Sequence, residues 1–182
     1  MTQLSLGTKL RDSMHAVLSG CETYRYALYR TVDPANESTL AWCMLNPSTA
    51  DAANDDPTIR KVKGFTKRLG YGRLVVVNAY SFRATKPKDL LAAQRRGEDI
   101  FGPRNDVYLR GAAGIADCCI VAWGAHLKDE AHARRVVELL REGGTKLYCL
   151  ARTNGGQPRH PLMLPYSHKP EPFELATARE TQ

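Results

Sequence analysis

The sequence predicts an α/β protein, a three-layer domain in which a mostly parallel four-stranded sheet lies between helices. Short apolar runs rich in β-branched residues alternate with longer stretches of helical periodicity, and this alternation is typical of a parallel sheet covered on both faces. The chain has 182 residues, of which 43% are hydrophobic and 25% charged, as expected of one domain with a single core. We expect that core over residues 24–165, followed by a loosely held tail over 166–182.

The first expected elements are two strands and a helix. Residues 24–31 and 39–45 are strand-like runs, and the turn-forming residues between them predict an antiparallel N-terminal hairpin. Apolar residues then recur at helical spacing over 57–69, where Gly70 supplies a stop signal. The hairpin therefore leads into the first helix through a polar loop.

The later elements continue the alternation of strand and helix. The run at 74–77 is continuous and β-branched, as in a central strand that is covered on both faces. An amphipathic pattern begins at His126 and ends at a pair of glycines. In chain order we expect a strand at 74–77, helices at 90–97 and 102–114, a strand at 115–123, a helix at 126–142 and a strand at 146–150.

Composition and spacing argue against several classes of protein. The number of cysteines is odd and none lies in a Cys-x-x-Cys pair, which argues against a disulfide framework or a zinc site. His126 and His132 lie six residues apart on one helix, which is not a metal-ligand spacing. No apolar run is long enough to span a membrane, and no signal peptide is evident. We therefore expect a cytoplasmic monomer without a metal, a cofactor or a membrane partner.

The most informative stretch follows the apolar run at 40–45. That run stops at Asn46, and the residues up to Arg60 gather amide, hydroxyl, carboxylate and guanidinium groups. Such loops, at the carboxyl end of a buried strand, form ligand sites in α/β proteins. The candidate substrate contacts at the start of this loop are Asn46, Pro47, Ser48 and Thr49.

Other strands are also followed by polar or aromatic residues. Because the carboxyl ends of parallel strands share one rim of the sheet, residues that are far apart in sequence can converge there. The expected members of this rim are Asn46, Asn78, Trp123 and His160. The loop after Asn78 adds the candidate base- or substrate-binding residues Tyr80, Phe82 and Arg83.

Each of these residues also has an ordinary structural explanation. Asn46 can turn the loop before Pro47, and an aspartate before Pro57 is a good helix cap. His160 precedes a proline, which favours an extended conformation typical of many surface loops. Trp123 is well suited to a core.

Several motifs together resemble a known family. They are residues 45–51 (LNPSTAD), 55–60 (DDPTIR), 70–72 (GYG), Asn78 and 158–162 (PRHPL). In this combination they resemble the bacterial and phage family catalogued as domain of unknown function 1643. The resemblance covers about residues 24–165 and implies no settled activity.

The order of the strand ends is also similar to that of the uracil-DNA glycosylase superfamily. That resemblance implies a four-stranded parallel sheet between helices, and hydrolysis of the N-glycosidic bond of a flipped base in DNA. Our own hypothesis is that the base is a modified one. It implies that Asn46 positions water, that Asn78 hydrogen-bonds the base edge and that His160 stabilises charge on the departing base. Two positions depart from the superfamily pattern: Ser48 stands in place of a glycine, and residues 162–164 (LML) replace a serine followed by proline or glycine.

The chemistry of this reaction defines the groups that a site must hold. Breaking an N-glycosidic bond develops positive charge on the sugar and negative charge on the base. A carboxylate or amide is needed near the sugar, and a donor such as His160 near the base. The carboxylate candidates are Asp51, Asp55 and Asp56. An extruded base also needs an aromatic face and amide readout, for which the candidates are Tyr80, Phe82 and Asn78.

The formal net charge of +7 favours DNA or a nucleotide as the partner. Phosphates that flank an extruded base must be held at the rim of its pocket. The candidate phosphate-binding residues are Arg60, Lys61, Arg83, Lys86, Arg152 and Arg159. Three alternatives stay open: an ordinary basic surface, a non-enzymatic nucleic-acid- or nucleotide-binding module, and an enzyme that acts on free nucleotides or nucleosides.

Overall fold

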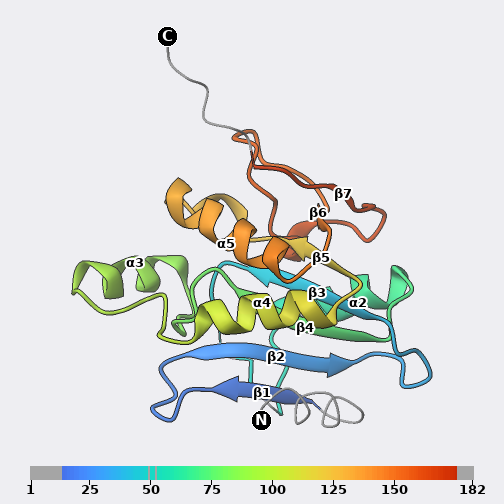
Figure 1. Ribbon diagram of the computed structural model, residues 1–182, viewed down its shortest axis with the longest axis horizontal. Coiled ribbons are helices and arrows are strands. Elements are labelled where there is room, and N and C mark those ends of the chain that lie inside the picture. The colour runs from blue at the N-terminus through green and yellow to red at the C-terminus, as the bar shows by residue number, and fades with distance from the viewer. Residues whose placement is uncertain (1–13, 49, 52, 176–182) are drawn as a thin grey trace.

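The computed structural model describes residues 14–48, 50, 51 and 53–175. This part of the chain forms one mixed sheet of seven strands, in the order β1-β2-β4-β3-β5-β6-β7, and four α-helices (Figure 1). The strands are β1 (His15–Leu18), β2 (Arg25–Thr31), β3 (Thr39–Met44), β4 (Arg73–Asn78), β5 (Cys118–Val121), β6 (Leu147–Cys149) and β7 (Glu171–Pro172). The helices are α2 (Pro57–Arg68), α3 (Pro87–Arg95), α4 (Asn105–Ile115) and α5 (Glu130–Glu142), with 3-10 turns η1 (Gly124–His126) and η2 (Pro161–Met163).

Four neighbouring strands, β4, β3, β5 and β6, are parallel and form the centre of the sheet. The predicted α/β class with parallel strands and intervening helices is therefore confirmed. The predicted sheet of four strands is too small, because β1, β2 and β7 extend the parallel centre with antiparallel pairings at both edges. The carboxyl ends of the four parallel strands lie at one edge of the domain, which is where the polar loops begin.

The predicted hairpin between residues 24–31 and 39–45 is wrong, because β4 lies between β2 and β3. The connection after β2 packs instead against the turn before β4. The Gly72 carbonyl accepts hydrogen bonds from the backbone N–H groups of Val32 and Asp33, at 2.8 and 3.0 Å. A Cβ at position 72 would clash with the Asn36 carbonyl. Turn-forming residues thus marked the bend correctly, but they do not specify which strand lies beside β2.

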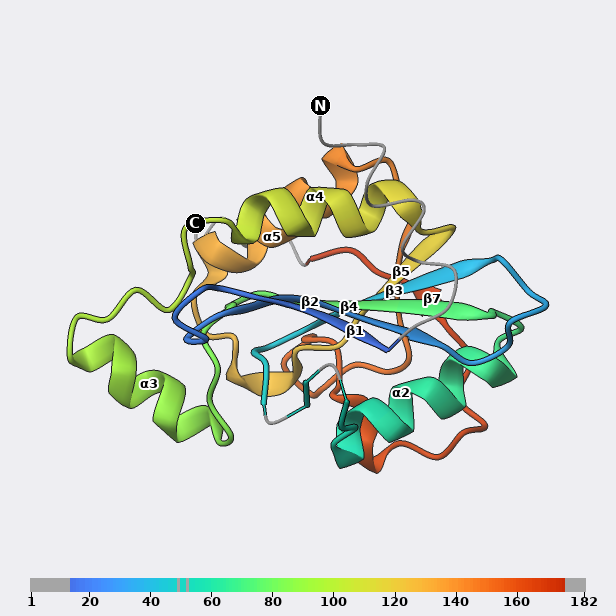
Figure 2. The same cartoon turned by 90° about the horizontal axis from the view of Figure 1, so that it is seen from below.

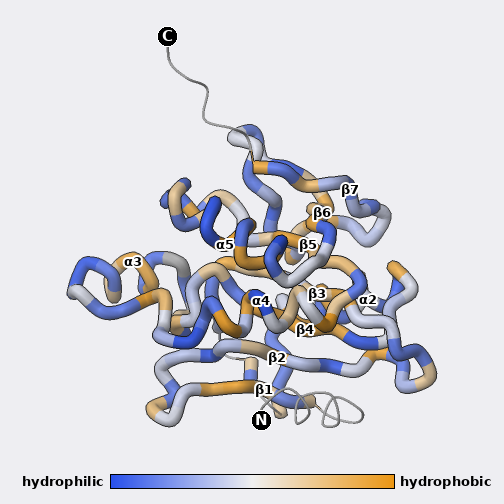
Figure 3. The backbone as a smooth tube through the Cα atoms, in the orientation of Figure 1, coloured by the Kyte–Doolittle hydropathy of each residue, from blue (hydrophilic) through white to orange (hydrophobic). Residues whose placement is uncertain are grey.

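The helices cover both faces of the sheet (Figure 2). α4 and α5 pack on one face through buried residues such as Leu109 and Val136. α2 packs on the other face through Ile59 and Phe65. Figure 3 shows that hydrophobic stretches run along the strands of the sheet, while hydrophilic stretches occupy peripheral turns. The parallel strands therefore run through two apolar layers, and their polar ends emerge at the rim.

The last part of the described chain is joined to the sheet. β7 pairs with β6, and the buried Phe173 packs edge-on against Trp123 with 5.6 Å between ring centroids. Residues 171–173 thus belong to the folded domain, although the sequence placed them in a loosely held tail; residues 176–182 lie outside the described part. Among the described residues, no helix has both the length and the apolar character needed to cross a membrane.

Candidate functional site

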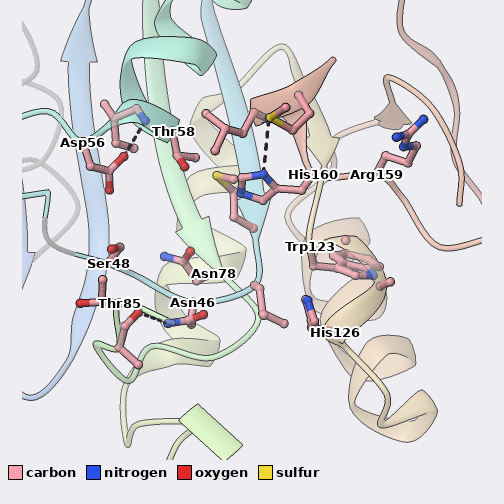
Figure 4. A pocket seen from close by; sticks show the side chains of 18 of the residues that line it. Asn46, Ser48, Asp56, Thr58, Asn78, Thr85, Trp123, His126, Arg159 and His160 are labelled. Carbon is pink, nitrogen blue, oxygen red and sulfur yellow. Dashed lines mark hydrogen bonds between the residues drawn. The ribbon is translucent and has the colours of Figure 1, made fainter. Parts of the chain in front are cut away.

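A cavity of about 520 Å³ opens at the carboxyl end of the parallel strands (Figure 4). Its walls come from the ends of β3 and β4, the turn after β5, the loop after β6 and the first turn of α2. Asn46, Asn78, Trp123 and His160 all line it, as expected where parallel strand ends share one rim. Its volume lies within the range of about 300–1,000 Å³ that is typical of small-molecule pockets.

Asn46 both organises its loop and offers an acceptor to the pocket. Its Nδ2 donates to the Pro47 carbonyl at 3.0 Å and to the Ala84 carbonyl at 2.8 Å. Because carbonyl oxygens only accept, these two bonds determine which side of the amide carries the nitrogen. The Oδ1 atom accepts no hydrogen bond from the described residues. In Figure 4 it lies on the side of the amide opposite to the hydrogen bond that Nδ2 donates. The structural explanation of Asn46 and its proposed site role are therefore compatible.

Asn78 is the last residue of β4 and is almost completely buried, at 1% exposure. It follows Leu74 and Val76 on the face of the sheet that α2 covers. Its Nδ2 atom is buried without a hydrogen-bond partner in the described protein. Leaving such a donor unpaired costs about 1–3 kcal/mol. A ligand acceptor in the pocket would satisfy it.

His160 presents a neutral imidazole to the pocket. Its Nδ1 accepts a hydrogen bond from the Leu162 backbone N–H at 3.3 Å, so the ring proton lies on Nε2. Burial lowers the pKa of His160, and the nearby Asp56 carboxylate opposes that shift only in part. The residue is nevertheless exposed to solvent. The loop is anchored by the Gly124 N–H, which donates to the Pro158 carbonyl at 2.8 Å.

Asp56 combines the capping and site roles that the sequence left open. Its Oδ1 accepts from the Ile59 backbone N–H at 2.8 Å, which caps α2. Asp56 also lines the pocket, together with Thr58 from the same turn. Its second carboxylate oxygen has no partner in the described part of the chain. Asp56 is thus the predicted carboxylate that the structure brings to the cavity.

The other two aspartates do not line the pocket. Asp51 Oδ1 accepts from the backbone N–H groups of Ala53 and Asn54, both at 2.8 Å, and shapes the loop. Asp55 forms ion pairs with Arg30 at 2.7 Å and Lys63 at 2.8 Å. Burial opposes ionisation of Asp55, but these two hydrogen bonds outweigh it and hold its pKa below the usual range. The structure places both in stabilising contacts.

The predicted aromatic face is also located elsewhere. Tyr80 is buried and stacks on His132, with 4.6 Å between ring centroids, and Phe82 packs against the core. Trp123 lines the pocket, but its Nε1 donates to Gln157 Oε1 at 2.9 Å, which supports its core interpretation. In the first loop Ser48 lines the pocket, Pro47 is buried outside the pocket wall, and Thr49 lies outside the described residues.

Of the six predicted phosphate-binding residues, only Arg159 lines the pocket. Three of the others donate to backbone carbonyls: Arg60 to Asp55, Arg83 to Glu22, and Arg152 to Gly156. Lys61 lies over the ring of Tyr166, 4.0 Å from its centroid. Lys86 is exposed at the start of α3. These residues therefore do not form a basic pocket wall.

Sequence reasoning missed several polar residues that line the cavity. They are Arg25, Thr58, Thr85, His126 and Thr153. Arg25 carried the clearest signal, because it is a charged residue next to the apolar positions of a strand-like run. A buried charge normally has a partner of opposite charge or a ligand. Within the described residues, no group of three or more His, Cys, Asp or Glu side chains is placed to hold a metal ion.

Comparison with known proteins identifies the family but no activity. No curated protein and no solved structure matches the chain significantly. A family described as "Protein of unknown function (DUF1643)" matches residues 25–162. This match spans most of the chain and includes every element from β2 to the start of η2, and thus nearly the whole pocket wall. The chain therefore belongs to the DUF1643 family.

Proposed function

We propose that the chain hydrolyses the N-glycosidic bond of a nucleobase, with a modified base in DNA as the first candidate substrate. The main support is the presence, in one pocket, of two N–H donors without protein acceptors in the described chain, Asn78 Nδ2 and His160 Nε2. Nucleobases carry carbonyl oxygens and ring nitrogens that accept such bonds. The parallel strand order β4-β3-β5-β6, with Asn78 at the end of β4 and His160 in the loop after β6, is a further support for the proposal.

In the proposed reaction, water attacks the anomeric carbon of the sugar. The bond from that carbon to the base nitrogen breaks, and its electrons leave with the base. The resulting negative charge is stabilised by a hydrogen bond from His160 Nε2–H. The lowered pKa of His160 keeps the ring neutral near pH 7, so it acts as a neutral hydrogen-bond donor. The proton that the water loses passes to solvent or to the departing base, and the products are the free base and the sugar hydroxyl.

Two acceptors are available to orient the water, Asn46 Oδ1 and the second oxygen of Asp56. The negative charge of Asp56 would also stabilise the positive charge that develops on the sugar. Asn78 would bind the base edge and so orient the bond to be broken. A positioned acid–base group typically contributes about 10²–10⁴-fold and an oxyanion donor about 10²–10³-fold.

A free nucleotide or nucleoside is the second candidate substrate. The observation that favours it is that, of the six predicted phosphate contacts, only Arg159 lines the pocket. A double-stranded DNA substrate would be expected to engage several basic residues at the rim. A small substrate would need only the groups inside the cavity.

The test is release of free base by the intact protein. Substrates would be DNA that carries uracil, hydroxymethylated or glucosylated pyrimidines, and the corresponding nucleosides and nucleotides. His160→Ala and Asn46→Ala should each reduce release about 10²-fold or more, and Asp56→Ala should reduce it as well. The controls His168→Ala and Asn154→Ala lie outside the pocket and should release base at the wild-type rate.

Two results would contradict the proposal. Release that survives both His160→Ala and Asn46→Ala would show that the pocket is not the site. Absence of release from every substrate, combined with tight DNA binding that weakens steeply with salt, would favour the non-enzymatic binding module.

A further inference from the structure

Two buried arginines on β2 have contrasting environments. Arg25 and Arg30 are each 2% exposed. Arg30 Nε donates to Asp55 Oδ1 at 2.7 Å, and its Nη1 donates to the Tyr29 carbonyl at 2.8 Å. Arg25 has no ion pair within the described chain; its Nη1 donates to the Ala50 carbonyl, and its Nε is buried without a partner. Arg25 is therefore a buried positive charge with unused donors.

A β-bulge turns Arg25 toward the pocket. The pairing of β1 with β2 shifts register at Tyr26. Tyr26 stacks on Tyr108 of α4, with 5.1 Å between centroids, and Ala27 lies on that same face. Arg25 consequently lies on the opposite face, where it contacts Ala50 and lines the cavity. Bulges beside functional sites commonly re-aim a side chain in this way.

The same cavity holds other groups that suit an anion. Ser48 and Thr58 supply hydroxyl donors, and Thr58 lies in the first turn of α2, where the helix dipole favours negative charge. Arg159 adds a second positive charge at the wall, against the single carboxylate of Asp56 among the described lining residues. Burial lowers the pKa of Arg25 to about 10, and Asp56 opposes that shift, so the guanidinium stays charged at neutral pH.

We propose that Arg25 forms an anion subsite of this pocket and holds a phosphate group of the substrate. A guanidinium binds phosphate oxygens through parallel N–H···O bonds, and an anion there would compensate a charge that the protein leaves unpaired. Phosphate suits the site better than carboxylate, because its additional oxygens can also accept from Ser48, Thr58 or Arg159. The phosphate belongs either to a free nucleotide or to the DNA backbone beside an extruded base. The identity of the substrate as a nucleotide rests on the proposed function, whereas the binding of phosphate does not.

Titration with inorganic phosphate tests the subsite directly. The wild type should bind phosphate saturably, and NMR should show the Arg25 Nε–H signal shifting during the titration. Arg25→Met should bind at least tenfold more weakly. The control is Arg110→Met, an arginine on α4 paired with Glu142 outside the pocket, which should bind like the wild type.

A stability measurement adds an independent readout. In phosphate-free buffer, Arg25→Met should melt at or above the wild-type temperature, because it removes a buried unpaired charge. No saturable binding by the wild type, an unshifted Arg25 signal or undiminished binding by Arg25→Met would each overturn the subsite. The NMR result needs only the wild type, so the proposal stays testable even if a variant folds poorly.

The source of the phosphate is decided by comparing uridine, uridine 5′-monophosphate and a uracil-containing oligonucleotide as ligands. Tighter binding of the monophosphate than of uridine indicates a free nucleotide, and tighter binding of the oligonucleotide alone indicates the DNA backbone. Equal binding of all three overturns the subsite. Base release without any phosphate effect would retain the proposed function and remove the subsite. Phosphate binding without base release would do the reverse.

Discussion

Replacing Asn78 with leucine is expected to stabilise the protein, whereas the same change at Asn105 is expected to destabilise it. Asn78 is 1% exposed and is the last residue of β4, and Asn105 is 3% exposed and is the first residue of α4. Asn78 Nδ2 has no partner in the described protein, but Asn105 Nδ2 donates to the backbone carbonyls of Asn78 and Ala79 at 3.0 and 3.1 Å. The pair therefore compares an unpaired Nδ2 donor with a bonded one.

The expected magnitudes follow from the cost of burying polar groups. An unpaired buried N–H costs about 1–3 kcal/mol, and Asn78→Leu removes it and adds a methyl-bearing side chain beside Val76. We expect a gain of about 1–2 kcal/mol in the free energy of unfolding, which corresponds to about 2–8 °C in Tm for a domain of this size. Asn105→Leu leaves two buried carbonyls without this donor. Because Asn105 Oδ1 is itself unpaired, the net loss should be about 1–2 kcal/mol.

Urea denaturation of the wild type and the two variants measures these changes, provided that the slope of the transition is unchanged. Base release should fall sharply in Asn78→Leu despite its greater stability, because the amide that binds the base edge is gone. A destabilisation of Asn78→Leu by more than about 1 kcal/mol would refute the reasoning, since it would mean that the amide is satisfied in the folded state.

Three further predictions test the surroundings of the pocket. Asp55→Asn should lower the free energy of unfolding by about 3 kcal/mol in urea, because it leaves Arg30 as an unpaired buried charge; wild-type stability combined with lost base release would restore a catalytic interpretation of Asp55. Burial lowers the pKa of His132 below its ordinary value of 6.5, with the hydrogen bond to Ala79 opposing, so below that pH the unfolded state binds more protons and Tm should fall as pH decreases. His132→Gln should flatten this dependence, and an unchanged slope would contradict the assignment. Gly124→Ala should cost about 1–2 kcal/mol for its positive φ. It should also reduce base release, because a backbone that relaxes this strain would disturb the Gly124 N–H bond to the Pro158 carbonyl, which anchors the His160 loop at 2.8 Å. Gly97 has a similar positive φ and open space around it, so Gly97→Ala should lose a similar amount of stability but keep the wild-type rate of base release. Equal base release by the two variants would show that His160 is not displaced in Gly124→Ala.

Local signals in the sequence were sufficient to predict the central part of the fold. The helix predicted over 57–69 is α2, and the β-branched run at 74–77 lies within β4. Both follow from local signals, namely apolar spacing and stop residues in the helix and continuous burial in the strand. The location of Asn46, Asn78 and His160 on one pocket could also be predicted from the sequence. The alternation of strands and helices predicts parallel strands, and the carboxyl ends of parallel strands share one rim of the sheet.

Tertiary structure alone decided which strands are neighbours and which polar residues reach the cavity. Pairing of β4 between β2 and β3 depends on contacts distant in sequence, so the turn-rich segment at 32–38 could not reveal it. Asp55 and Asp56 are adjacent in sequence, yet the direction of the chain at the start of α2 turns one toward Arg30 and the other toward the pocket. Arg25 reaches the cavity only because a bulge at Tyr26 reverses its side of the sheet. Composition indicates which chemical groups are available, and their direction is determined by register, bulges and helix starts that are specified by the packing of the whole domain.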